Sequence, residues 1–280
     1  MVWLEWLTTP LGFGFMQRGI IAAIATGVVC AILSCFLVLK GWSLMGDAIS
    51  HAVLPGMVVA IIAGVPIVVG AFGSGLFCAL AIGFIKDRCR VKEDSVMGIV
   101  FSGMFALGLV LFSRIDTDQH LTHILFGNML GITTSELWQM LVIAAVVSLI
   151  VLVKRHDVLL YCFDPSQAKA VGMSVKRLHY GLLCLLALTI VAALQAVGVI
   201  MAIAMLIAPG ATAVLICRRF DHMLLVATLV SVFSCISGTL ISFYIDGATG
   251  PCIVLMQVAV FFLTQLCRLA NRNLHPATPG

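Results

Sequence analysis

Asp47 and His51 are the residues whose types and spacing most clearly suggest chemistry. They stand in the run GDAISHAVLPG, residues 46–56, which holds no other ionisable side chain. Residues four apart lie on one face of an α-helix, about one turn from each other. A carboxylate and an imidazole placed in this way can ligate a divalent first-row metal ion. The pair is therefore the first candidate for a functional site.

The chain around this pair is strongly apolar. Its 280 residues are 62% hydrophobic and 10% charged, with a mean hydropathy of +1.17, whereas soluble domains are about 45–50% apolar and about 25% charged. Several apolar runs exceed the roughly 20 residues that span a bilayer as a helix, and they are continuous rather than alternating as in an outer-membrane barrel. We expect an all-α, polytopic transmembrane helical bundle. Charged residues at membrane depth usually mark an ion or substrate path.

Hydropathy and turn signals predict nine membrane spans, within a range of eight to ten. Their approximate bounds are 16–39, 44–63, 66–85, 95–113, 137–153, 180–197, 199–216, 223–245 and 250–267. The connection 114–136 is ambiguous, because 119–133 is apolar enough to hold a re-entrant or interfacial helix. Residues 1–272 are expected to form one transmembrane domain, followed by a short tail over 273–280.

Basic residues near the span ends are distributed unequally. If the N-terminus lies outside, one side collects Lys40, Lys86, Arg88, Arg90, Lys92, Lys154, Arg155, Lys169, Lys176, Arg177, Arg218, Arg219, Arg268 and Arg272. The other side keeps Arg18 and Arg114. By the positive-inside rule the first set faces the cytoplasm. The N-terminus is then outside and the C-terminus inside.

The external side carries a second group of potential metal ligands. These are Asp116, Asp118, His120 and His123. They could form a weak external site where cations first meet the protein, or they could be ordinary solvated loop residues.

The longest polar stretch, about 154–179, falls on the cytoplasmic side. Within it, 163–173 is predicted to form one short helix, because Asp164 can cap its start, Pro165 suits its first position and Gly172 its end. Ala168 lies near its middle and adds to its apolar residues. Such a helix could dock into a groove on another protein, or be a simple surface helix.

Several functions are excluded or disfavoured. Nothing matches GxxxxGK[ST], HExxH or a dinucleotide-binding fingerprint, so the chain is not expected to be an enzyme. Any ATP that drives it must be hydrolysed by a separate subunit. The ten cysteines form no CxxC pair, which argues against a disulfide framework or structural zinc. No cleaved signal peptide is expected, and in a membrane protein the net charge of +4 indicates no nucleic-acid partner.

Three segments resemble one family. The run 46–56 is similar to the signature of permeases from manganese, zinc and iron ABC importers, the ABC-3 type. Residues 197–213, VGVIMAIAMLIAPGATA, resemble that family's later glycine- and proline-containing membrane segment, and 163–173 resembles its cytoplasmic coupling segment. The similarity extends over about 16–270.

The resemblance implies a type II importer in the bacterial inner membrane, surrounded by membrane lipid. Its implied partners are a cytoplasmic ATP-binding subunit, an extracytoplasmic metal-binding protein and a second permease subunit, identical or related. It also implies that Asp47 and His51 handle the metal, and that Asp164, Pro165, Ala168 and Gly172 belong to the contact with the ATPase. The divalent metal ion, Mn²⁺ or Fe²⁺ with Zn²⁺ as a further candidate, is transported substrate, and no permanently bound cofactor is expected.

Two interpretations of the pair remain open. Asp47 and His51 could bond each other or the backbone and so pin a bend near Pro55, since a buried charge needs a partner. Alternatively they bind the ion in transit. One chain supplies two ligands where a closed zinc site has four, so two facing chains would complete a site, and conduction requires that it release the ion.

Two other functions remain as alternatives. The chain could be a stand-alone, proton-coupled secondary transporter in which the pair relays protons. It could also be an ABC permease for a metal chelate, which has no need of an Asp–His pair.

Overall fold

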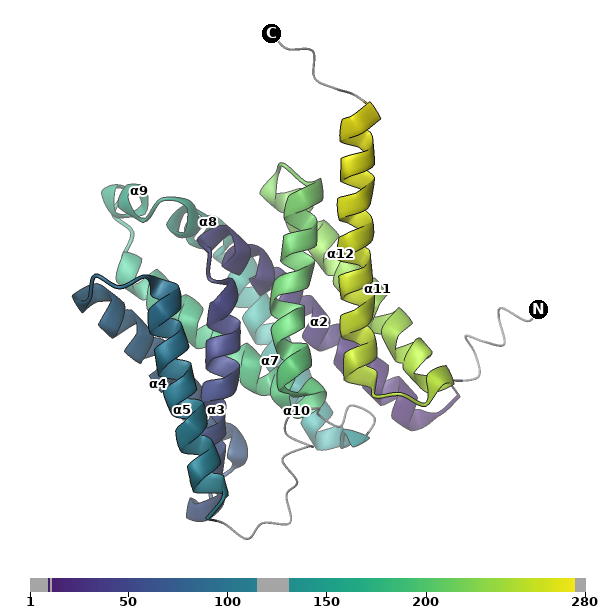
Figure 1. Ribbon diagram of the computed structural model, residues 1–280, viewed down its shortest axis with the longest axis horizontal. Helices are drawn as coiled ribbons and strands as arrows, with labels where there is room; N and C mark the ends of the chain where they lie inside the picture. The colour runs from purple at the N-terminus through teal and green to yellow at the C-terminus, as the bar shows by residue number, and fades with distance from the viewer. Residues whose placement is uncertain (1–9, 11, 115–130, 275–280) are drawn as a thin grey trace.

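The computed structural model describes Pro10, residues 12–114 and residues 131–274, and within these ranges it is helical with no strand. The helices are α2 (Gly14–Lys40), α3 (Ser43–Ala63), α4 (Ile67–Arg88), α5 (Glu93–Phe112), α7 (Thr134–Val153), α8 (Arg155–Phe163), α9 (Pro165–Ala170), α10 (Val175–Ile216), α11 (Phe220–Ile245) and α12 (Thr249–Leu274). Figure 1 shows most of them side by side in one bundle, with α8 and α9 at one end.

The expected all-α membrane bundle is confirmed. In the described ranges, eight helices are long and apolar enough to cross a bilayer. Two predicted spans, 180–197 and 199–216, fall within the single element α10. The second of them corresponds to Met201–Ile216, which is apolar but shorter than the other eight.

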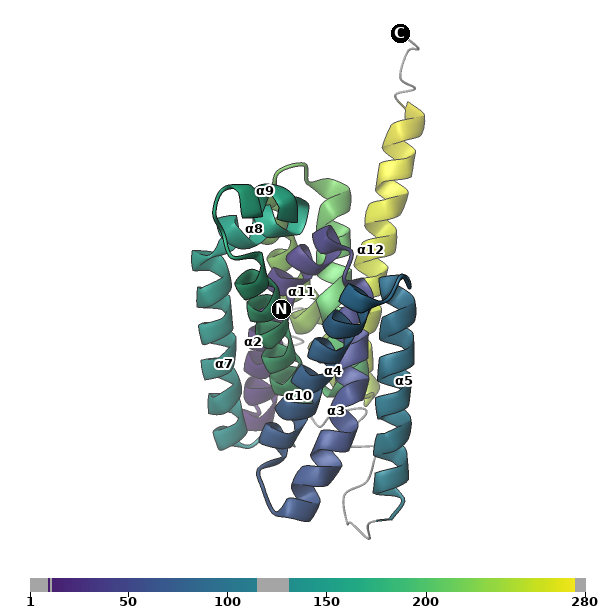
Figure 2. The same cartoon turned by 90° about the vertical axis from the view of Figure 1, so that its left-hand side faces the viewer.

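α10 consists of two arms that meet at Gly198. This glycine has φ 77° and ψ 172°, a conformation that only glycine adopts readily. His179, near the start of α10, forms a hydrogen bond with Tyr161 of α8. Asp221, just after the end of α10, forms an ion pair with Arg155, which is also in α8. Both ends of α10 therefore lie at the end of the bundle that holds α8 and α9, the upper end in Figure 2, so the chain reverses direction within α10.

α2 forms the centre of the bundle, because 72% of its most apolar stretch is buried inside the protein. Small residues let its neighbours come close. The hydroxyl of Ser34 accepts a hydrogen bond from the backbone N–H of Gly210 at 2.6 Å, and Ser231 donates to the carbonyl of Gly27 at 2.9 Å. Such contacts replace the hydrophobic driving force that is missing between helices in lipid.

α3, the helix that carries the pair, is fixed on two sides by glycines. Gly56 of α3 faces the backbone of Gly70 and the side chain of Ser74, both on α4, with no room for a Cβ. Gly108 of α5 packs in the same way against Leu54. The middle of α3 is therefore held rigidly between α4 and α5.

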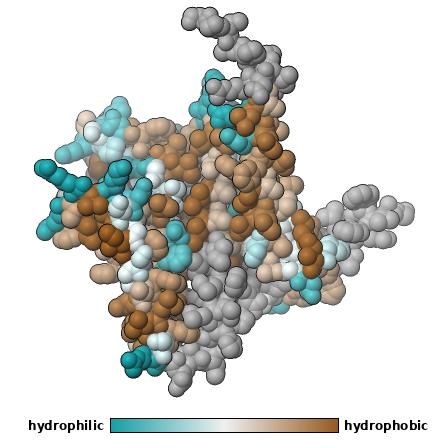
Figure 3. Space-filling view, viewed as in Figure 1, coloured by the Kyte–Doolittle hydropathy of each residue, from teal (hydrophilic) through white to brown (hydrophobic). Residues whose placement is uncertain are grey.

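The outer surface is largely apolar. Only 11% of the most apolar stretch of α12 is buried inside the protein, and only 17% of that of α5. Figure 3 shows broad apolar surface across the bundle, with hydrophilic residues gathered near the junction of α4 and α5 and around α9. The chain is a multi-pass membrane protein. Its exposed apolar faces are suited to contact with lipid or with another subunit.

Because the α3–α4 contact is glycine on glycine, Gly56→Ala should destabilise the protein by about 1–3 kcal/mol through overpacking against backbone that cannot move aside. Thermal unfolding in detergent measures this loss. The matched control is Gly73→Ala on α4, where a Cβ meets nothing within 4 Å. That variant should be neutral or gain up to about 1 kcal/mol. Equal stability of the two variants would contradict the tight crossing.

Candidate metal site and coupling segment

Asp47 and His51 face each other on the first half of α3. Nδ1 of His51 lies 3.1 Å from Oδ1 of Asp47 and 3.0 Å from the Asp47 carbonyl oxygen. Both of these oxygens are acceptors, so Nδ1 carries the proton. In the neutral imidazole with this tautomer, the lone pair of the other ring nitrogen, Nε2, is available to a metal ion. The two side chains are 30% and 27% exposed, so the pair lies at the bundle surface and not within a closed core.

This geometry joins the two interpretations that the sequence left open. The residues do bond each other, as the structural interpretation expects. The same bond, however, is the one by which a carboxylate orients a metal-binding histidine, since the ring nitrogen that does not bind metal donates to it. The second carboxylate oxygen and Nε2 remain as donors for an ion. The pair can thus be a preorganised half of a metal site.

Two aromatic rings of α5 hold the imidazole from the side. The ring of Phe105 is 5.2 Å from that of His51 in an edge-to-face arrangement, and Phe101 is 5.6 Å away. Sequence reasoning missed both residues. Their i, i+4 spacing is visible in the sequence, but only the packing of α5 on α3 assigns them to His51.

Ser50, next to His51 in the chain, already has a hydrogen-bond partner. The Ser50 hydroxyl donates to the carbonyl of Gly46 at 2.8 Å, as expected for a helix serine. Among the described residues, no group of three or more His, Cys, Asp or Glu side chains is placed to hold a metal ion. Asp116, Asp118, His120 and His123 lie outside the described residues.

The predicted coupling segment is helical, with bounds that differ from the expected single helix over 163–173. The helix α9 is shorter, Pro165–Ala170, and α8 precedes it. The carboxylate of Asp164 caps α9 by accepting from the N–H groups of Ser166 and Gln167 at 2.8 and 3.0 Å. Pro165 is the first helical residue, and Gly172 has φ 86° just past the end. Asp164 also ends α8, so it is the single residue between the two helices.

The apolar residues of this segment divide into two groups. Ala168 is fully buried against the chain itself, so it anchors α9 rather than facing outward. Phe163 and Val171, by contrast, are 66% and 64% exposed. Two large apolar side chains left in water at the ends of a capped helix form a surface suited to a partner.

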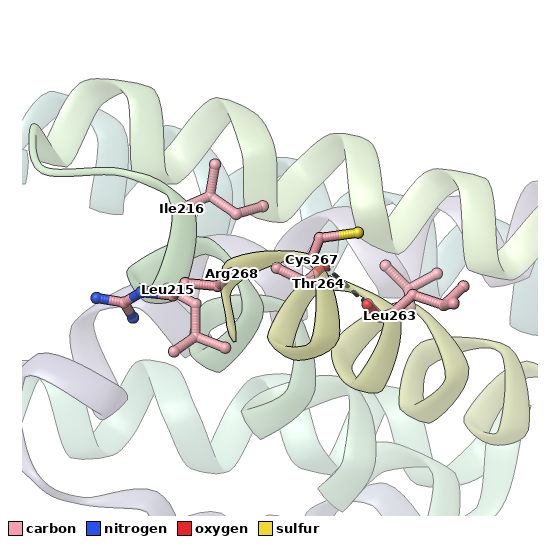
Figure 4. A pocket seen from close by; sticks show the side chains of 7 residues that line it. Leu215, Ile216, Leu263, Thr264, Cys267 and Arg268 are labelled. Carbon is pink, nitrogen blue, oxygen red and sulfur yellow. Dashed lines mark hydrogen bonds between the residues drawn. The ribbon is translucent and has the colours of Figure 1, made fainter. Parts of the chain in front are cut away.

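A cavity of about 480 Å³ lies between the end of α10 and α12 (Figure 4). Its lining is Leu215, Ile216, Val260, Leu263, Thr264, Cys267 and Arg268. It offers one arginine and no carboxylate or imidazole, so its chemistry does not suit a divalent cation.

Comparison with known proteins identifies the family. Residues 12–268 match the ABC 3 transport family. This chain belongs to that family. YfeD of Yersinia pestis, a chelated iron transport system membrane protein, is 71% identical to this permease, covering 97% of it and 93% of YfeD. MntB of Synechocystis, a manganese transport system membrane protein, is 48% identical, covering 94% of this permease and 86% of MntB.

A solved structure has the same fold. One chain of PsaBC from Streptococcus pneumoniae, in complex with a Fab, superimposes with a TM-score of 0.85 at 36% identity, over 94% of this permease and 95% of that chain. The permease is therefore a membrane subunit of an ABC transporter and not an enzyme, and ATP hydrolysis belongs to a separate subunit. The predicted family is confirmed.

Proposed function

We propose that this permease carries bare divalent metal ions, Mn²⁺ or Fe²⁺ with Zn²⁺ also accepted, into the bacterial cytoplasm. The observation that carries the proposal is the Asp47–His51 pair, a carboxylate and an oriented imidazole on a membrane helix. Oxygen and nitrogen donors accept all three ions. The named substrates of the relatives, manganese and chelated iron, are in keeping with this range.

A chelated metal is the second candidate, because the name of the 71% identical relative specifies chelated iron. A chelate that fills the coordination positions of its metal, however, leaves none for the imidazole nitrogen or the carboxylate oxygen of the pair. The chemistry of the pair therefore favours the bare ion.

We further propose that two permease subunits face each other and that each contributes one pair. Two carboxylates and two imidazoles would complete a four-residue site, whereas the described residues of one chain hold no group of three or more such ligands. The partial exposure of both side chains supports this arrangement, because ligands at a bundle surface remain accessible to a second subunit. An extracytoplasmic binding protein would deliver the ion.

The bundle end that holds α8 and α9 is proposed to face the cytoplasm, in the inner membrane, with the N-terminus outside. The structure brings Lys40, Arg155 and Lys169 to this end. The basic turn between α4 and α5 and the basic turn between α10 and α11 lie there as well. Such clustering of positive charge supports that orientation. The exposed Phe163 and Val171 would then meet the ATPase subunit.

Reconstitution tests the substrate and its energy source together. In proteoliposomes holding the permeases, the ATPase and the binding protein, radiolabelled Mn²⁺ and Fe²⁺ should enter only with ATP. Uptake by the permease alone under a proton gradient would instead establish the secondary-transporter alternative. Uptake of iron only when it is supplied as a chelate would establish the chelate alternative.

The pair can be tested in the same vesicles. Asp47→Ala or His51→Ala should lower uptake at least about tenfold, since an interaction with a charged group is lost and its partner is left unpaired. Assembly of the complex should survive, because both side chains are partly exposed. Ser50→Ala is the matched control, since its hydroxyl bonds only the Gly46 carbonyl. It should transport like the wild type, whereas wild-type uptake by both pair variants would remove the pair from transport.

The coupling surface predicts a separate defect. Phe163→Ala combined with Val171→Ala should weaken co-purification of the ATPase subunit about tenfold or more, as expected for buried apolar anchors of an interface. Ile245→Ala is the control, because Ile245 is 70% exposed at the opposite end of the bundle. ATPase retention unchanged by the double variant would place the ATPase contact elsewhere.

A further inference from the structure

Four residues form a compact polar and aromatic cluster where the coupling segment meets the start of α3. They are Lys40, Trp42, Tyr161 and His179, here called the α3 junction. Lys40 is the last residue of α2, Trp42 directly precedes α3, Tyr161 lies in α8 and His179 in the first turns of α10. None of them belongs to the metal pair or to the exposed coupling surface.

His179 is the centre of the α3 junction. Its Nδ1 and the hydroxyl of Tyr161 share a hydrogen bond of 2.8 Å. The Trp42 ring lies edge-on to the imidazole at 5.2 Å. On the remaining side, the ring packs against α4 at Gly83, where a Cβ would stand 3.4 Å from Nε2. One histidine thus contacts three other segments.

Lys40 also binds Tyr161, through two separate contacts. Its ammonium group donates to the carbonyl oxygen of Tyr161 at 3.3 Å and lies 4.3 Å from the centre of that residue's ring. A cation above an aromatic face is worth more when it is partly desolvated, and Tyr161 is only 3% exposed. Tyr161 is therefore held through its hydroxyl, its ring and its backbone.

The α3 junction lies on a short route from the coupling segment to the metal pair. Tyr161 is three residues before Asp164, the residue shared by α8 and α9. Trp42 is 2% exposed and five residues before Asp47, which is about 7 Å of helix rise. A displacement of α9 reaches Tyr161 through Asp164, then Lys40 and His179, and then the first turn of α3.

We propose that the α3 junction transmits movement of the coupling helices to Asp47 and His51, with Tyr161 and His179 as positioning residues. This inference rests on the proposed function, since it needs an ATPase docked on α9 and a metal on the pair. By contrast, another link from α8, the Arg155–Asp221 pair, is 40% and 65% exposed. Exposed ion pairs contribute little, so the buried α3 junction is the stronger of these two connections.

The test uses the full reconstituted complex and measures metal ions transported per ATP hydrolysed. Tyr161→Phe removes one hydroxyl and keeps the ring under Lys40. It should lower this ratio about fivefold to tenfold, the factor expected for one lost hydrogen bond, while ATP turnover stays within about twofold. His179→Phe should act alike. His179→Asn, which keeps a hydrogen-bonding nitrogen or oxygen near the position of Nδ1, should restore most of the ratio.

Two controls match these variants. Tyr180→Phe makes the same change one residue from His179 on an exposed side chain, and Asp221→Asn removes the exposed link from α8. Both should couple like the wild type. An unchanged ratio in Tyr161→Phe and His179→Phe would overturn the proposal, as would a parallel fall of transport and ATP turnover, which would show a purely structural cluster. Failure of the proposed function appears differently, as an absence of ATP-dependent uptake in the wild-type complex.

Discussion

Within an apolar bundle, a buried polar side chain depends on the protein itself for its hydrogen bonds, and this constraint orders much of the structure. Many polar residues satisfy it locally: Thr26, Ser50 and Thr212 each donate to the carbonyl four residues earlier. Others join helices, as Ser34 does with Gly210. Asp47 and His51 satisfy each other and still retain a carboxylate oxygen and a ring nitrogen. That remaining capacity separates the pair from the serine and threonine contacts, which are used up in holding helices together.

The same constraint explains why glycines fix the helix that carries the pair. Between helices in lipid there is little hydrophobic driving force, so close backbone approach supplies the packing energy. Gly56 against Gly70 and Gly108 against Leu54 lock the middle of α3. The first turn of α3 follows a left-handed Gly41 and depends instead on Trp42 and its neighbours. The structure thus combines a rigid middle with a start that is tied to α8, and Asp47 and His51 lie between them.

The sequence was informative where local rules decide. Continuous apolar runs predicted the membrane helices, and Asp164, Pro165 and Gly172 predicted the capped α9, since capping depends on neighbouring residues only. Spacing alone predicted that Asp47 and His51 would lie on one face of a helix, about one turn apart. It could not predict α8, whose buried Tyr161 and Cys162 depend on contacts with distant helices. Nor could it join Lys40 to Tyr161 or His51 to Phe105, because those pairs are 121 and 54 residues apart and meet only after the helices pack.

A transported ion must be bound and then released, so the energy of the site has to change during the cycle. Shifting an occupancy from 99:1 to 1:99 takes about 5.5 kcal/mol, which exceeds the roughly 0.5–1.5 kcal/mol of one hydrogen bond. Small rearrangements around His51 are therefore insufficient by themselves. Separating two half-sites removes half of the ligands at once, and a rigid α3 moves both ligands of its half together. A metal site divided between two permeases, with each half oriented internally by the bond from Nδ1 to Asp47, meets this energetic requirement better than a closed site in one chain.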